Sequence, residues 1–247
     1  MAGSFKIKLK KDLPALFKRL ANRLHFYPTF IPEQGQIDWG DFKTVTPFSN
    51  NFGFDRSGPV DRYYIENFLE AESSVIKGNV LEIADNAYTT KYGGDKVTKS
   101  DVLHLDEGAA GATYVADLSR ADHLPSDQFD CIILTQTLQF IYDYTSALKH
   151  CYRMLKKDGV LLVTVPGISP IEAGRWRTNW LWSFNEACMN KLFSENFPAK
   201  SYSVQAYGNV YAAISFLHGV GITETDQSKL DIRDPSYDVI ITTRLKK

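Results

Sequence analysis

The stretch that decides the fold is Asn79-Val80-Leu81-Glu82-Ile83-Ala84-Asp85-Asn86-Ala87-Tyr88. Its apolar run ends in an acid and then breaks into small and turn-forming residues, a pattern typical of a buried strand that leads into a sharp turn. Ligands of open parallel sheets bind at such strand ends, because the loops part there. Asp101 follows about twenty residues later, the offset at which an acid on the next strand can reach a ribose hydroxyl. The stretch therefore predicts a site for a nucleoside-type cofactor.

The composition indicates one soluble globular domain of the larger kind, with 247 residues of which 44% are hydrophobic. A net charge of -1 gives no basic stripe for nucleic acid, so no nucleic-acid partner is expected. The three cysteines, Cys131, Cys151 and Cys188, have no metal-type spacing and form no even disulfide set, which favours a reducing compartment without a metal site. Apolar runs such as 160–165 are too short to span a membrane. We therefore expect a cytoplasmic protein that is at most peripheral to a membrane.

Residues 1–52 are predicted to form a basic, helical extension, and residues 53–247 the main domain. An amphipathic helix is expected from Asp12, because a capping acid is followed closely by Pro14. This helix could pack on its own domain or on a partner, or it could lie on an anionic membrane surface. The apolar residues that share one stripe of it are Leu13, Leu16, Phe17, Leu20 and Leu24.

Short apolar strands alternate with helical or linking segments along the main domain, which favours a parallel sheet covered on both faces. Helices are predicted from about residue 55 to 74, and over 144–155 and 185–197. The segment Lys156-Lys157-Asp158-Gly159 is predicted to close the second of these, as a cationic last turn followed by glycine. Strands are predicted over 79–83, 96–100 (ending at Asp101), 112–116, 129–135, 159–165, 202–206 and 237–244, the last of them antiparallel.

Several segments together carry a family resemblance. They are Val80-Leu81-Glu82-Ile83-Ala84, the acids Asp101 and Asp117, the run 129–134, and the turn and strand over 155–166. In order and spacing they resemble class I S-adenosylmethionine-dependent methyltransferases, from about residue 53 to the end. The resemblance implies an α/β fold with a seven-stranded, mostly parallel, doubly wound Rossmann-like sheet. Segments 85–94, 135–140 and 207–210 look more narrowly like a bacterial subgroup that accompanies glycan-building enzymes, which implies a sugar or surface-polysaccharide substrate.

The loop after the first strand departs from the family pattern. The family has glycines where this chain has Ala84, Asn86 and Tyr88. Glycine allows close approach of the backbone to a cofactor and a positive φ. Ala84 is still small and Asn86 tolerates a left-handed conformation, but Tyr88 requires another path that could place Tyr88 or Thr89 against the ligand. The loop is expected either to bind the cofactor in an altered way or to have lost it.

By resemblance, Glu82 would orient the turn and the amino-acid end of the cofactor. Asp101 would accept both ribose hydroxyls, with Asp106 in its place if the second strand instead covers 102–105. Asp117, with the Leu118 backbone, would read the adenine edge. Thr135 and Gln136 would face the methionine part. The full set of predicted cofactor residues is Glu82, Ala84, Asp85, Asn86, Tyr88, Asp101, Asp117, Leu118, Thr135 and Gln136.

The implied chemistry is displacement of a methyl group from a sulfonium by a substrate oxygen, in which alignment and desolvation supply much of the rate. A hydroxyl nucleophile must also lose a proton, which a nearby His, Asp or Glu can accept. The sequence does not identify this base. Its candidates are His104, His218 and Glu172, each of which equally suits a structural role.

Two aromatic, arginine-containing segments are candidates for binding the acceptor. Aromatic faces with interspersed polar groups suit a pyranose, although a tryptophan-rich cover on the sheet and a capping network would have the same composition. The predicted substrate residues are Arg56, Arg62 and Tyr63 before the first strand, and Arg175, Trp176 and Trp180 after the fifth.

The sequence thus predicts a methyltransferase that modifies a sugar or glycan hydroxyl in polysaccharide biosynthesis. One alternative is a non-catalytic scaffold of the same fold with a degenerate cofactor site. Another is a nicotinamide oxidoreductase, but residues 84–88 of this chain lack the glycine-rich fingerprint that such an enzyme requires.

Overall fold

The computed structural model describes residue 17 and residues 31–174 and 176–247. The chain divides into two compact units, Met1–Val45 and Thr46–Lys247. Within the first unit, the described residues contain one short 3-10 turn, η1 (Gly40–Lys43). The predicted helix from Asp12 lies outside the described residues except for Phe17.

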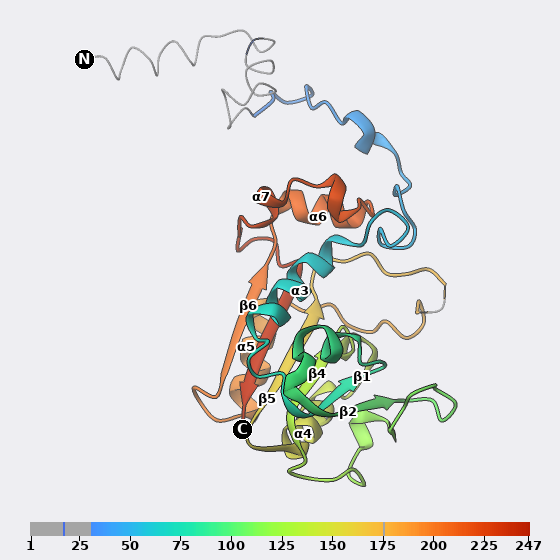
Figure 1. The fold of residues 1–247 in the computed structure, drawn as a ribbon. Helices are drawn as coiled ribbons and strands as arrows, with labels where there is room; N and C mark the ends of the chain where they lie inside the picture. The colour runs from blue at the N-terminus through green and yellow to red at the C-terminus, as the bar shows by residue number, and fades with distance from the viewer. Residues whose placement is uncertain (1–16, 18–30, 175) are drawn as a thin grey trace, which may run out of the picture. The chain divides into compact units, whose positions relative to one another are not determined.

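The second unit is built on one seven-stranded sheet with the order β3-β2-β1-β4-β5-β7-β6 (Figure 1). β7 pairs antiparallel with both of its neighbours, and every other pairing is parallel. The prediction of a mostly parallel, seven-stranded sheet is therefore confirmed. The strands are β1 (Gly78–Ile83), β2 (Val97–His104), β3 (Tyr114–Val115), β4 (Phe129–Thr135), β5 (Leu155–Pro166), β6 (Tyr202–Tyr207) and β7 (Ile240–Lys246).

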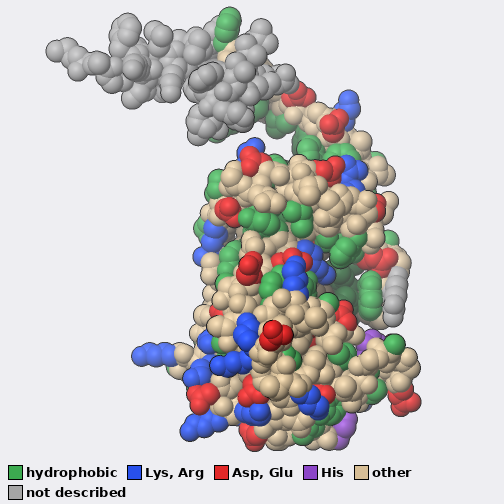
Figure 2. Space-filling model, viewed as in Figure 1, with side chains coloured by type: hydrophobic (Ala, Val, Ile, Leu, Met, Phe, Trp, Pro, Cys, Tyr) green, Lys and Arg blue, Asp and Glu red, His purple; other side chains and the backbone are tan. Residues whose placement is uncertain are grey.

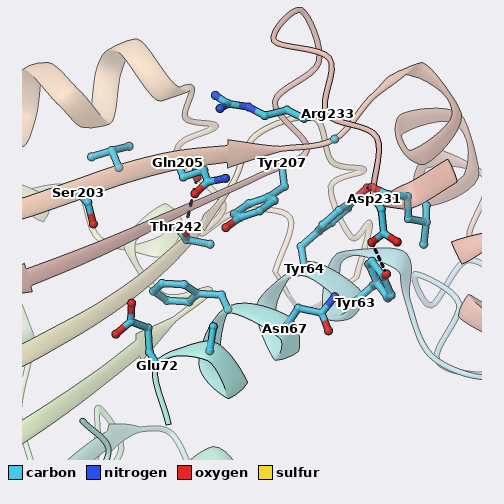
Figure 3. A pocket seen from close by; sticks show the side chains of 15 residues that line it. Tyr63, Tyr64, Asn67, Glu72, Ser203, Gln205, Tyr207, Asp231, Arg233 and Thr242 are labelled. Carbon is cyan, nitrogen blue, oxygen red and sulfur yellow. Dashed lines mark hydrogen bonds between the residues drawn. The ribbon is translucent and has the colours of Figure 1, made fainter. Parts of the chain in front are cut away.

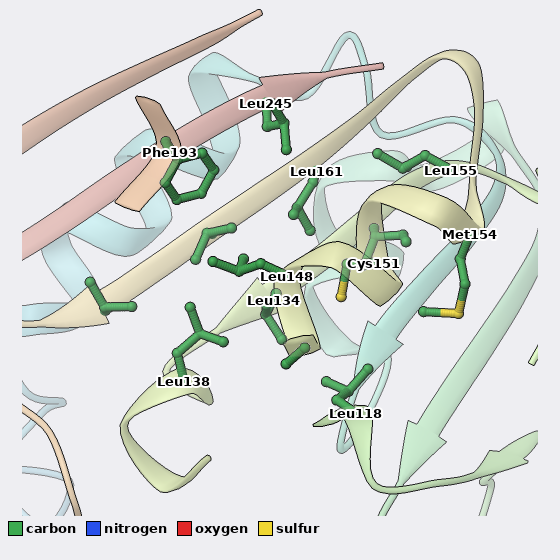
Figure 4. Packing of buried hydrophobic residues seen from close by; sticks show 14 of the residues in the cluster. Leu118, Leu134, Leu138, Leu148, Cys151, Met154, Leu155, Leu161, Phe193 and Leu245 are labelled. Carbon is green, nitrogen blue, oxygen red and sulfur yellow. The ribbon is translucent and has the colours of Figure 1, made fainter. Parts of the chain in front are cut away.

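One face of the sheet is covered by α4 (Tyr144–Met154) and α5 (Glu186–Asn196). Figure 4 shows the cluster of buried side chains between these helices and the central strands. The helices begin where side chains cap their free amides: Asp143 accepts from Ser146 N, and Asn185 from Cys188 N. Buried residues of this cluster include Leu134, Leu148, Cys151, Leu161, Phe193 and Leu245.

The opposite face is covered by α3 (Val60–Ala71) and α6 (Val210–Leu217), followed by the short α7 (Gln227–Leu230). In Figure 1, α3 lies across the strands on the side away from α5. Its apolar side packs on strand residues of the second core cluster, among them Val80, Ile133 and Leu162.

The link from β1 to β2 has no α-helix of its own and consists of two short turns, η2 (Thr89–Gly93, a π-helix) and η3 (Gly94–Lys96). Because this link is short, α3 supplies most of the helical cover on that face of β1. Further 3-10 turns are η4 (Leu118–Arg120), η5 (Leu138–Phe140) and η6 (Ile222–Glu224).

Several predicted boundaries are wrong. α3 covers Val60–Ala71 rather than about 55–74, and β7 covers Ile240–Lys246 rather than 237–244. β2 continues to His104 instead of ending at Asp101. The helix α4 ends at Met154, and the segment after it is extended: Leu155 already pairs with Phe129, so residues 156–159 form an irregularity within β5 rather than a helix cap. The left-handed residue there is Asp158, with φ 66°. The sequence analysis did not predict α6.

Positive and negative side chains alternate over the face shown in Figure 2. In the described part of the chain, no helix has the length and apolar character that crossing a bilayer requires.

Candidate active site

A cavity of about 1270 Å³ opens at the carboxyl-terminal edge of the sheet. The last residues of three parallel strands, Ile83 of β1, His104 of β2 and Thr135 of β4, all line it. β1 and β4 are neighbours at the centre of the sheet, and the chain leaves them toward opposite sides of the strand order. The cavity therefore lies at the switch point where open α/β sheets bind their ligands.

The turn after β1 is held by the buried carboxylate of Glu82, which is 2% exposed. Tyr88 N donates to its Oε1 at 3.2 Å, and Thr89 N donates to its Oε2 at 2.7 Å. Burial raises the pKa of Glu82, although its bonds to Thr89 and Tyr88 oppose the shift. Asp85 adds a second local bond by accepting from Ala87 N at 2.9 Å. Carboxylate bonds thus shape a loop that glycines shape in the wider family.

Four residues at the cavity have a positive φ: Ser57 (128°) and Gly58 (102°) before α3, and Ala84 (76°) and Gln136 (46°). The last two follow β1 and β4, the two central strands, and neither is glycine. Such a conformation costs an L-residue about 1–2 kcal/mol and is found most often at functional sites. Asn86, by contrast, has no positive φ, does not line the cavity, and donates its side-chain amide to Ser100 Oγ.

We expect Ala84→Gly to raise the free energy of unfolding by about 0.5–1 kcal/mol, because relief of the left-handed strain exceeds the entropy that glycine adds to the unfolded chain. Ala87→Gly is the matched control: Ala87 is exposed in the same loop but has no positive φ. Its substitution should lower stability by a similar amount. Urea unfolding of both variants measures the difference. Equal losses of unfolding free energy in the two variants would contradict backbone strain at Ala84.

Tyr88 forms part of the cavity wall and stacks on Tyr92 with 6.1 Å between ring centroids. Burial raises the pKa of its phenol to about 12, so it remains neutral. The ring leaves the cavity open. The altered loop therefore keeps space for a ligand despite its lack of glycines.

The acid of the second strand is placed differently from the prediction. Because β2 runs on to His104, Asp101 lies within the strand, opposite Leu81, and its side chain is 1% exposed. It pairs with Lys99 at 2.8 Å and does not line the cavity. Asp106, the alternative, lies just beyond the strand and does line it.

Asp117 and Leu118 line the cavity beside β3. Asp117 caps the turn η4: its Oδ1 accepts from Ser119 N at 2.8 Å and from Ser119 Oγ at 2.7 Å. Both bonds use one oxygen, so Oδ2 is left to face a ligand. Leu118 is buried and offers an apolar surface next to it.

Thr135 and Gln136 also line the cavity, at the end of β4. Gln136 is fixed by its own backbone bonds, since its N donates to Thr164 O at 2.9 Å and its O accepts from Gln139 Nε2 at 2.9 Å. Its side chain donates to Thr164 Oγ1 at 3.3 Å. Thr164 belongs to the neighbouring strand β5. Its bonds therefore hold the left-handed backbone of Gln136.

The predicted substrate residues separate into two groups. Arg62 and Trp176 line the cavity. Arg56 pairs instead with Glu224, Tyr63 turns to Asp231, and Trp180 packs on Phe52 and Phe140. Arg175 lies outside the described residues.

The three candidate bases are not equivalent. His218 stacks near Phe48 and does not line the cavity. Glu172 accepts from Gly174 N at 2.7 Å and Trp176 N at 2.8 Å, so it shapes the loop that carries Trp176. His104 lines the cavity, but its Nδ1 accepts from Asp106 N at 2.9 Å. With that bond the neutral ring carries its proton on Nε2, from which it can donate to a ligand.

Other lining residues were not predicted. Some of them follow β4 in the same loop as Gln136. The sequence could have indicated these residues, because ligands of parallel sheets bind where the strands end. Phe54 comes from a distant loop and has no such signal. Asn179, which also lines the cavity, belongs to the tryptophan-rich loop after the fifth strand that was a candidate for binding the acceptor. The missed residues with aromatic or acidic side chains are Phe54, Glu66, Phe140, Tyr142 and Asp143.

The fold and the site define a class I S-adenosylmethionine-dependent methyltransferase. A family profile described as a methyltransferase domain matches residues 47–197, more than half of the chain, and the chain belongs to this family. Comparison with curated protein sequences gave no match.

Solved structures show the same fold. An S-adenosylmethionine-dependent methyltransferase from Archaeoglobus fulgidus superposes with a TM-score of 0.51 at 9% identity, over 75% of this chain and 94% of that one. The plantazolicin methyltransferase BamL, solved with SAH, gives 0.50 at 11% identity over 80% and 88%. The [4+2]-cyclase SpnF gives 0.50 at 14% over 83% and 87%. Since one of these proteins is a cyclase, the fold alone does not define a reaction.

The lining of the cavity fits S-adenosylmethionine, the cofactor of this class. That molecule carries a positive sulfonium and an ammonium, and acids outnumber arginines around the cavity. The cavity also exceeds the usual range of about 300–1,000 Å³ for small-molecule sites, which leaves space for an acceptor beside the cofactor. The charged groups are the acids Glu66, Glu82, Asp85, Asp106, Asp117 and Asp143, and the arginines Arg62 and Arg120.

Proposed function

We propose that this methyltransferase transfers the methyl group to a hydroxyl of a sugar or glycan, as a step of polysaccharide synthesis. The observation that carries the proposal is the aromatic composition of the cavity beyond the predicted cofactor residues. The residues there include four phenyl, phenol or indole rings, an amide and an arginine of α3. They are Phe54, Phe140, Tyr142 and Trp176, with Asn179 and Arg62.

The aromatic rings contact one another and neighbouring side chains. Phe140 lies 5.0 Å from Trp176 between ring centroids and 5.4 Å from Trp180. Arg62 donates to Asp61 at 2.8 Å, and its guanidinium lies 5.6 Å from the ring centroid of Phe54. A sugar ring has apolar C–H faces and hydroxyl edges, so fixed aromatic faces with polar groups between them suit it.

S-adenosylmethionine supplies an electrophilic methyl group on its sulfonium. In our proposal, Asp106 accepts from the ribose hydroxyls, and Asp117 with Leu118 holds the adenine. The acidic turn at Glu82 and Asp85 faces the amino-acid end. The acceptor oxygen would form the new C–O bond as the C–S bond breaks, the demethylated thioether would be the leaving group, and the hydroxyl proton would pass to water. The chain contributes alignment and removal of water, which account for much of the rate in such displacements.

The experiment is incubation of the full chain with cofactor labelled in its methyl group and with nucleotide sugars or lipid-linked glycans, followed by mass spectrometry. The expected product is heavier by one labelled methyl, carried on a hydroxyl of the sugar. Transfer to a nitrogen or to a non-sugar acceptor would overturn the substrate class but not the reaction. Calorimetric titration with S-adenosylmethionine tests the alternative of a scaffold, because a dead site gives no heat of binding.

We expect Trp176→Ala to raise KM for the acceptor by up to about tenfold, since an aromatic contact contributes about 0.5–1.5 kcal/mol beyond its buried area. Affinity for the demethylated cofactor should remain unchanged. Trp39→Ala is the control. Trp39 is exposed in the other unit, so its substitution should change neither the KM for the acceptor nor the affinity for the demethylated cofactor. Steady-state kinetics gives the KM. A loss of cofactor affinity instead would place Trp176 on the cofactor side.

A further inference from the structure

A second cavity, of about 370 Å³, lies between α3 and the paired strands β6 and β7 (Figure 3). It shares no lining residue with the larger cavity. Successive residues of α3 border the two: Arg62 and Glu66 face the larger cavity, and Tyr63 and Asn67 face the smaller one. One helix therefore separates two distinct cavities.

The wall of this second cavity is aromatic. Tyr64 of α3 and Tyr207 of β6 stack with 5.8 Å between ring centroids and 26° between ring planes. Tyr64 is fixed because its hydroxyl donates to Leu230 O at 3.0 Å. Phe68, one turn further along α3, extends the apolar surface. Because Tyr64 is itself buried, the ring surface open to the cavity comes from Tyr63, Phe68 and Tyr207, which are partly exposed.

Uncharged polar groups surround these rings. Asn67 projects from α3, and Ser203 and Gln205 project from β6 on the opposite side, as Figure 3 shows. All three residues are exposed. Each amide offers both donors and acceptors, and the hydroxyl of Ser203 offers one donor and two acceptors. A ligand between α3 and β6 could therefore receive hydrogen bonds from two sides.

The charged groups of the cavity are already bonded within the protein. Glu72 accepts from Arg244 Nε at 3.0 Å. Arg233 donates to both carboxylate oxygens of Glu186, at 2.8 and 2.9 Å. Asp231 accepts from the hydroxyl of Tyr63 at 2.6 Å. The one cation that lines the cavity, Arg233, is thus paired with a carboxylate, which favours an uncharged ligand over an anionic one.

We propose that this second cavity is a binding site for an uncharged sugar ring. Aromatic faces meet the C–H faces of such a ring, and amide and hydroxyl groups from two elements meet its hydroxyl edges. The inference goes beyond the proposed methyl transfer, because it concerns a separate cavity and binding alone.

The test uses the side-chain amide signals of Asn67 and Gln205 in ¹H–¹⁵N spectra of the full chain, assigned with Asn67→Asp and Gln205→Glu. Cellobiose and maltose are the probes, with glucuronate as the charged comparison. We expect both signals to shift in a saturable way with at least one disaccharide and not with glucuronate. Absence of a saturable shift with both disaccharides, or an equal response to glucuronate, would overturn the proposal.

The double variant Asn67→Ala/Gln205→Ala should raise the Kd for the responding disaccharide about tenfold, as expected from the loss of two ordinary hydrogen bonds. Gln227→Ala, an exposed glutamine on α7 outside the cavity, is the matched control and should leave the Kd unchanged. An unchanged Kd in the double variant would mean that the sugar binds elsewhere, and the proposal fails. Because no step of this test uses methyl transfer, its result is independent of the labelled-cofactor experiment.

Discussion

Asp106→Asn is expected to weaken binding of the demethylated cofactor by about ten- to a hundredfold. Asp106 lines the cavity just after β2, where a carboxylate can accept from both hydroxyls of a ribose. A hydrogen bond to a charged group contributes about 1.5–3 kcal/mol, which corresponds to this range of affinity. Calorimetric titration measures it. The unliganded variant should unfold at the same temperature as the parent, because Asp106 is exposed.

Asp101→Asn is the matched control for this prediction. It removes the charge of the other acid of the same strand, whose side chain is buried and pairs with Lys99 away from the cavity. We expect its cofactor affinity to match the parent while its stability changes. If Asp101→Asn weakened binding and Asp106→Asn did not, the ribose would lie on the other side of β2 from where we place it.

Glu82→Ala is expected to lower the free energy of unfolding by about 2–4 kcal/mol. The substitution leaves the amides of Tyr88 and Thr89 without their acceptor, and an unsatisfied buried group costs about 1–3 kcal/mol. This loss is a large share of the stability of a typical domain, about 5–15 kcal/mol. Urea unfolding measures it. Asp85→Ala, which removes one exposed cap in the same loop, should cost only about 1 kcal/mol.

Glu82→Gln tests the same carboxylate through pH. Burial raises the pKa of Glu82, so the folded chain keeps this proton above the ordinary glutamate pKa of about 4.3. Between the two pKa values the unfolded state binds fewer protons than the folded state, and stability falls as pH rises. The free energy of unfolding of the parent minus that of Glu82→Gln should therefore decrease across this window and then become constant. A difference that rises with pH would contradict a raised pKa of Glu82 in the folded chain.

The central strands could be predicted from the sequence because most of their residues are apolar. β4 has the predicted bounds, since a strand buried on both faces gives a continuous apolar run. β2 does not: its first half carries the polar residues Thr98, Lys99 and Ser100, and the buried run that begins after Ser100 opens with Asp101. Polar residues within a strand resemble the end of one, so the end of β2 was predicted at Asp101 instead of His104.

The direction of side chains could not be predicted. Tyr63 and Arg62 are neighbours on α3, yet they face different cavities. Trp176 and Trp180 lie in one loop, and only Trp176 reaches the larger cavity. Composition indicates that a segment is rich in aromatic residues, whereas the packing of α3 and of the loop decides which of them meet a ligand.

The position of α3 has a consequence for how the chain can be shortened. This helix precedes β1 in the sequence, yet it contributes Arg62 and Glu66 to the larger cavity and covers Val80 and Ile133. A truncated protein that starts at β1 would retain all seven strands but expose that apolar face to water, and aggregation is the expected outcome. During translation the helix leaves the ribosome before the surface on which it packs exists, so its docking has to wait until the sheet has formed.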